Sequence, residues 1–78
     1  MNVLRERIRR QLASKYRRDL REGRLTAAQA RELLDKLQEA LEKAKRTNRR
    51  VTIEGQEALG TLSEAEIEDQ LSALRRAL

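Results

Sequence analysis

The sequence contains no cysteine, histidine, proline, tryptophan or phenylalanine, and tyrosine occurs once. Without cysteine the chain can form no disulfide, and without cysteine and histidine we expect no structural zinc site. The same two absences exclude nucleophiles activated as in Ser-His-Asp or Cys-His systems, and the common metalloprotease site. We therefore expect a protein that is not an enzyme and has no metal, no cofactor and no small-molecule substrate.

Long apolar runs are also absent. No segment approaches the roughly 18 apolar residues of a membrane span, and the start shows no apolar core of a signal peptide. A helix lying on a membrane surface would need Trp or Phe on its apolar side, and Tyr16 alone gives little for the stacking of bases. We therefore expect a soluble protein of a reducing compartment, with no membrane partner.

The chain is short for an independent fold. Its 78 residues suffice for a single domain, and 10 of its 30 hydrophobic residues are alanine, which leaves 20 larger apolar side chains for a core. Domains below about 80 residues rarely obtain more than about 3–5 kcal/mol from a single core. We therefore expect closely packed helices together with a homo-oligomer.

Arginine is abundant and unevenly placed. Residues 1–24 carry a net charge of +6, residues 25–50 carry +3, and residues 51–78 carry −4. A dense basic surface of this kind favours contact with nucleic acid, without sequence preference, or with an acidic protein surface, while a solvated helix face is the alternative. The residues predicted to form this basic contact face are Arg5, Arg9, Arg10, Arg17, Arg18, Arg21 and Arg24.

The first helix is predicted over residues 2–22. Asn2 suits the N-cap position, and Gly23 suits the left-handed residue that follows a helix. Apolar side chains recur every four residues, at Leu4, Ile8, Leu12, Tyr16 and Leu20. Because each such step advances by about 40°, the stripe drifts around the helix, and its two ends should face different neighbours.

Two further helices are predicted over residues 27–46 and 64–77. Each begins with a capping box, in which a side-chain oxygen and a residue three positions later satisfy each other's backbone N–H groups. The capping residues are Thr26 and Gln29 for the second helix, and Ser63 and Glu66 for the third. The apolar faces are predicted to form a seam that also serves assembly between copies, through Leu33, Leu37, Leu41, Ile67, Leu71 and Leu74.

Residues 50–61 do not follow a helical pattern. The β-branched run 51–53 predicts a short strand with Val51 and Ile53 on one face. A turn at 54–56 and a return strand over 57–61 would complete a small hairpin, and a plain loop is the alternative. The fold class is therefore mainly α, with three helices and a short hairpin or loop between the second and third.

The order of elements after the first helix resembles a known family. The residues that carry the resemblance are Leu25-Thr26-Ala27-Ala28-Gln29-Ala30-Arg31-Glu32-Leu33-Leu34, Arg50-Val51-Thr52-Ile53-Glu54-Gly55 and Leu62-Ser63-Glu64-Ala65-Glu66-Ile67. They are similar to the small bacteriophage head–tail joining proteins, the W-like family, over residues 25–78. The resemblance implies a homo-oligomeric ring in the neck of a virion, around the DNA channel and beside the portal or other neck proteins. The basic helix over residues 1–24 lies outside it.

Three functional hypotheses follow for this single domain of residues 1–78. The first is a non-enzymatic phage or prophage connector subunit, assembled in the bacterial cytoplasm and located in the virion. The second is a small basic helical protein of the cytoplasm that binds nucleic acid or acts in regulation as a dimer. The third is an interaction protein that inhibits a host enzyme by surface contact. Oligomer size and salt-sensitive DNA binding separate the first two.

Overall fold

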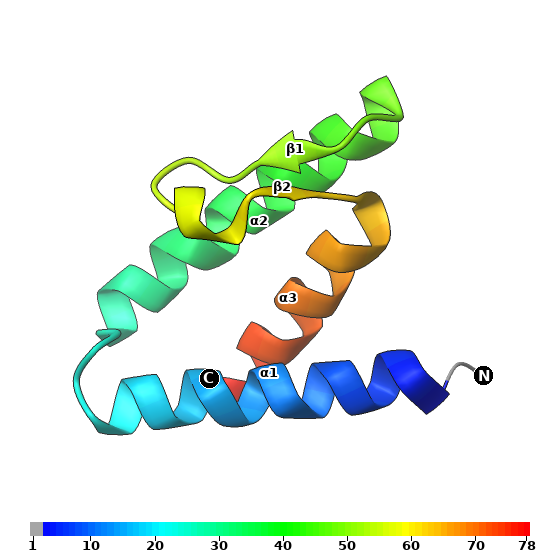
Figure 1. Ribbon diagram of the computed structural model, residues 1–78. Helices are drawn as coiled ribbons and strands as arrows, with labels where there is room; N and C mark the ends of the chain where they lie inside the picture. The colour runs from blue at the N-terminus through cyan, green and yellow to red at the C-terminus, as the bar shows by residue number, and fades with distance from the viewer. Residues whose placement is uncertain (1–2) are drawn as a thin grey trace.

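The computed structural model describes residues 3–78 and contains three helices and a two-stranded hairpin (Figure 1). The helices are α1 (Val3–Arg21), α2 (Ala27–Thr47) and α3 (Glu64–Ala77). Between α2 and α3 the chain forms β1 (Val51–Thr52), the 3-10 turn η1 (Glu57–Leu59) and β2 (Thr61–Leu62). The predicted fold class is confirmed. Asn2, the predicted N-cap of α1, lies outside the described residues.

Helix α3 lies between the other two helices. It packs against α1 and against α2, and α1 and α2 diverge from the turn that joins them (Figure 1). The molecule is flat, with extents of 36 × 30 × 18 Å. Because α1 and α2 both turn their inner faces toward α3, their outer faces lie along different edges of the molecule.

Both predicted capping boxes are confirmed. The backbone N–H of Gln29 donates to Thr26 Oγ1 at 3.1 Å, and the Thr26 N–H donates to Gln29 Oε1 at 3.0 Å. The Glu66 N–H donates to Ser63 Oγ at 3.2 Å, and the Ser63 N–H donates to Glu66 Oε1 at 2.9 Å. The bonds from Ser63 hold the pKa of Glu66 below its usual value, and nearby Arg50 adds to this effect.

The turn between α1 and α2 depends on one glycine. Gly23 has φ of +78°, as predicted for the residue after the helix, and it meets no steric obstacle there. The Glu22 N–H donates to the carbonyl of Arg18 at 2.8 Å, and the Leu25 N–H donates to the carbonyl of Asp19 at 3.1 Å. These bonds satisfy carbonyls that the end of α1 would otherwise leave unpaired.

The hairpin forms, but its return strand differs from the prediction. Val51 pairs with Leu62 in the antiparallel ladder, and both Val51 and Ile53 are buried as expected. The predicted return strand over 57–61 is wrong, because its first three residues form η1, whose geometry suits the helix-favouring sequence Glu-Ala-Leu. Gly60, with φ of +68°, then turns the chain back into the strand.

The predicted seam makes up the centre of the core. Five of its six side chains are buried within the single chain, namely Leu33, Leu37, Ile67, Leu71 and Leu74, and Leu41 packs partly buried against them. This burial leaves the five buried side chains no surface to offer to a neighbouring copy. The drifting stripe of α1 behaves differently along its length. Tyr16 is buried, whereas Leu4 is 64% exposed.

Candidate nucleic-acid interface

The inner side of α1 carries arginines that hold this helix against α3. Asp69 is only 6% exposed, and its Oδ1 accepts from Arg9 Nε at 2.7 Å and from Arg5 Nη2 at 3.2 Å. Arg5 also lies 3.5 Å from a carboxylate oxygen of Glu68 and donates to the carbonyl of Ala65. The hydrogen bond and charge of Asp69 raise the pKa of Arg5 above its usual value. Arg5 and Arg9, predicted to meet an external partner, therefore meet the acidic start of α3.

Further polar contacts fix the ends of the α1–α3 contact. Arg76 pairs with Glu6 at 2.7 Å, which lowers the pKa of Glu6 and raises the pKa of Arg76 from their usual values. The Arg17 guanidinium donates to the carbonyl of Arg76 at 3.3 Å. Arg24 pairs with Asp19 and Glu22 around the turn after α1. Arg24 is therefore engaged locally, away from the outer face of the helix.

The outer side of α1 and its flank toward the end of α3 carry a second set of arginines, which we call the arginine strip; Arg17, which donates to the carbonyl of Arg76, lies on that flank. All of its members are exposed, and they are Arg7, Arg10, Arg17, Arg18 and Arg21. These residues are spaced so that their side chains lie on one face of the helix. From Arg7 to Arg21 the face is about 21 Å long, since a helix rises 1.5 Å per residue. Within residues 3–78 none of them forms an ion pair with a carboxylate, although the charge of Arg10 helps to lower the pKa of Glu6. Most of their positive charge is therefore uncompensated.

One member of the arginine strip was missed by the sequence analysis. Arg7 is exposed and lies on the same face as Arg10 and Arg21. The sequence contained the signal, because Arg7 lies three residues before Arg10 and fourteen before Arg21, and both spacings place side chains on the same face of a helix. Counting arginines by density alone does not separate the inner set from the outer set.

The single tyrosine supports the α1–α3 contact and is not available for stacking. Tyr16 is 7% exposed, and its hydroxyl donates to Gln70 Oε1 on α3. Burial, together with the negative charge of Asp19, raises the pKa of Tyr16 to about 12. Lys15 lies beside the ring, 5.9 Å from its centre.

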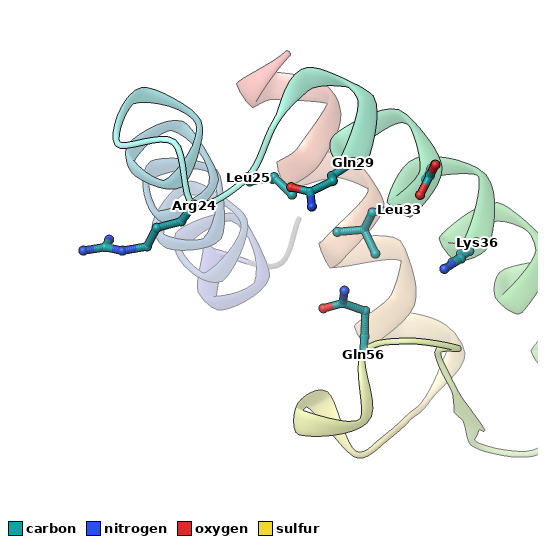
Figure 2. Close-up of a pocket in the computed structure, with 7 residues that line it drawn as sticks. Arg24, Leu25, Gln29, Leu33, Lys36 and Gln56 are labelled. Atoms are coloured by element: carbon teal, nitrogen blue, oxygen red, sulfur yellow. The ribbon is translucent and has the colours of Figure 1, made fainter.

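One hollow on the described surface lies beside the turn between α1 and α2. The hollow in Figure 2 has a volume of about 260 Å³ and lies between the start of α2 and the loop after β1. In that view Gln56 points toward Leu33, and Arg24 points away from the hollow. The remaining lining residues are Leu25, Gln29, Glu32 and Lys36. Amide and charged groups thus surround two leucines.

Comparison with known proteins identifies no relative of this chain. No protein-family model, curated protein or solved structure matches the chain. Across residues 3–78 no cluster of three or more acidic side chains is placed to hold a metal ion. None of the helices in that range combines the length and the apolar character needed to cross a membrane. The arginine strip is thus the most distinctive chemical feature of the described surface.

Proposed function

We propose that this protein is a non-enzymatic binding protein that uses the arginine strip of α1 to hold the phosphate backbone of nucleic acid. The observation that carries the proposal is the row of exposed arginines without carboxylate partners along about 21 Å of one helix face. Guanidinium groups match phosphate geometry well, since they donate two parallel hydrogen bonds and keep their charge at all ordinary pH values.

The inner contacts of α1 support this role. Arg5 and Arg9 hold the helix on α3 through Asp69, so the outer face is presented on a fixed support. A face of this kind binds phosphates through charge, with affinity that falls as salt rises because condensed counterions are released. Five phosphate contacts would give a slope of about −4.5 in a plot of log K against log salt for duplex DNA.

The test compares two triple variants that remove equal charge. Arg10, Arg18 and Arg21 belong to the arginine strip and form no hydrogen bond or ion pair within the described chain, so replacing them by Gln keeps the contacts that join α1 to α3. The control variant replaces Arg31, Arg46 and Arg49, which are also exposed and unpaired there. Fluorescence anisotropy with labelled DNA over a range of salt gives K and its slope.

We expect the strip variant to bind more weakly than wild type, with a slope flatter by about 2.7. The control variant lowers net charge by the same amount but should keep the wild-type slope. If both variants weaken binding equally, the protein responds to net charge and the strip is not the contact face. If wild type binds no DNA at low salt, the proposed function is wrong.

A second candidate function is a head–tail connector subunit that acts by homo-oligomeric assembly beside the portal or other neck proteins. Its support is the helix–hairpin–helix order of residues 25–78 and an acidic row on the outer face of α2. The row consists of Glu32, Asp35, Glu39 and Glu42, all exposed and without ion pairs inside the described chain. Basic residues flank this row, and they compensate part of its negative charge; they are Arg31, Lys36 and Lys43.

In this candidate the arginine strip of one copy meets the acidic row of the next. The two faces lie on different edges of a flat molecule, so contacts would be head-to-tail, and such contacts close into rings or extend into filaments. Sedimentation at low salt tests it. A ring that dissociates when Glu32, Asp35, Glu39 and Glu42 are replaced by their amides supports the connector, and a wild-type monomer at every salt concentration contradicts it.

A further inference from the structure

We propose that the ligand of the arginine strip is B-form duplex DNA, with α1 lying in the major groove; this inference rests on the proposed nucleic-acid function and narrows it to one form of nucleic acid. The observations behind it are the arrangement of the strip in two rows, the position of α1 at an edge of the molecule and the burial of the single aromatic side chain.

The arginine strip divides into two rows along α1. With 3.6 residues per turn, Arg7 and Arg18 point within about 20° of each other, and Arg10, Arg17 and Arg21 lie within about 40°. The two rows are centred about 70° apart around the helix, and a small residue, Ser14, lies between them. A flat row would suit one strand, whereas two diverging rows suit phosphates on the two sides of a groove.

The position of α1 allows such an approach. The helix runs along one edge of the molecule, with α3, α2 and the hairpin all on its inner side (Figure 1). A helix with its side chains is about 10–12 Å across, and the major groove of B-form DNA is about 12 Å wide. The short side chain of Ser14 between the rows lets the middle of α1 approach the floor of the groove while the longer arginines reach toward the phosphates.

The same features disfavour the other forms of nucleic acid. Proteins hold single strands largely by stacking bases on exposed aromatic side chains, and Tyr16 is buried against α3 with its hydroxyl bonded to Gln70. Duplex RNA has a deep, narrow major groove that side chains do not enter, and its wide minor groove is recognised through 2′-hydroxyls. A single strand offers one phosphate row, and the narrow major groove of duplex RNA does not admit a helix between its two phosphate rows.

The test measures the binding of wild-type protein to four probes of equal length, about 20 base pairs or nucleotides, which is two turns of B-form DNA. The probes are duplex DNA, the matching duplex RNA, one DNA strand alone, and duplex DNA whose cytosines carry a bulky C5 substituent that projects into the major groove. Anisotropy at one low salt concentration gives the four dissociation constants.

We expect unmodified duplex DNA to bind at least about tenfold more tightly than each of the other three probes. Equal binding of duplex RNA or of the single strand would overturn the choice of B-form DNA, and no effect of the C5 substituent would overturn major-groove docking. In each of those cases the proposed nucleic-acid function would stand. Failure of all four probes to bind would instead reject the proposed function itself.

Discussion

The carboxylate of Asp69 is the most informative residue to perturb, because it is the buried charged group at the α1–α3 contact. It is 6% exposed, and one of its oxygens accepts from Arg5 and Arg9 together. No buried side-chain polar atom among the described residues lacks a partner. Replacing Asp69 therefore removes the acceptor that orients two arginines and leaves their guanidinium groups facing α3.

The expected loss of stability is moderate. Removing one partner of a fully buried ion pair costs about 3–5 kcal/mol, and a hydrogen bond to a charged group contributes about 1.5–3 kcal/mol. The side chains of Arg5 and Arg9 are 33% and 27% exposed, so both can turn toward water once the carboxylate is gone. We therefore expect Asp69→Ala to lower the free energy of unfolding by about 2 kcal/mol, and Asp69→Asn by about 1 kcal/mol, because the amide keeps an acceptor oxygen.

Urea unfolding followed by circular dichroism measures these changes against a total stability of about 4–12 kcal/mol for a chain of this length. Glu68→Gln is the matched control, since Glu68 lies 3.5 Å from Arg5 but is 36% exposed and should contribute less than about 1 kcal/mol. A double-mutant cycle of Asp69→Asn with Arg9→Gln should give a coupling of at least about 0.5 kcal/mol. If Asp69→Ala is no more destabilising than the control, the carboxylate does not hold α1 on α3.

Three further predictions concern capping, the core and ionisation. Ser63→Ala should cost about 0.5–2 kcal/mol by removing the cap of α3, whereas Ser72→Ala, in mid-helix, should be near neutral in the same urea experiment. Leu37→Ala should cost about 2–5 kcal/mol and Ile8→Ala much less, because Leu37 is fully buried and Ile8 is 37% exposed; equal losses would contradict the placement of the core. The pKa of Tyr16 is raised to about 12, so between pH 10 and 12 the unfolded chain loses this proton while the folded protein keeps it. Stability should therefore fall with rising pH, by at most about 1.4 kcal/mol per pH unit, and Tyr16→Phe should remove that part of the pH dependence in unfolding curves.

Much of the fold could be predicted because its signals are local. The starts of α2 and α3 follow from Thr26 and Ser63, whose side chains pair with residues three positions away. The end of α1 follows from Gly23 for a similar reason. The return strand of the hairpin could not be located from the sequence, because a strand of two residues depends on what packs beneath it. Three of the residues predicted to form it, 57–59, form η1 instead.

The sequence predicted that the candidate site consists of arginines on the first helix, but it did not predict which of these arginines face solvent and which face α3. Which arginines of α1 face solvent depends on where α3 crosses the helix, and that is a long-range property. Asp69 illustrates this, since its sequence position in the second turn of α3 suggests only a favourable charge near a helix start. Its burial between Arg5 and Arg9 becomes visible only once α1 and α3 are packed.

Part of the charge difference between the two ends of the chain is neutralised by ion pairs within the molecule, and this limits which charged surfaces can bind a partner. The basic first helix was expected to meet either nucleic acid or the acidic end of another copy. In the folded chain Arg5 and Arg9 engage Asp69, Arg5 also pairs with Glu68, and Arg50 pairs with Glu66. Most of the acidic charge at the start of α3 is therefore paired within the chain. An acidic partner such as the phosphate backbone would therefore meet the outer arginine strip, whose members form no ion pair within residues 3–78. Because phosphates and a second copy would compete for that same face, added duplex DNA should disperse head-to-tail assemblies if both occur.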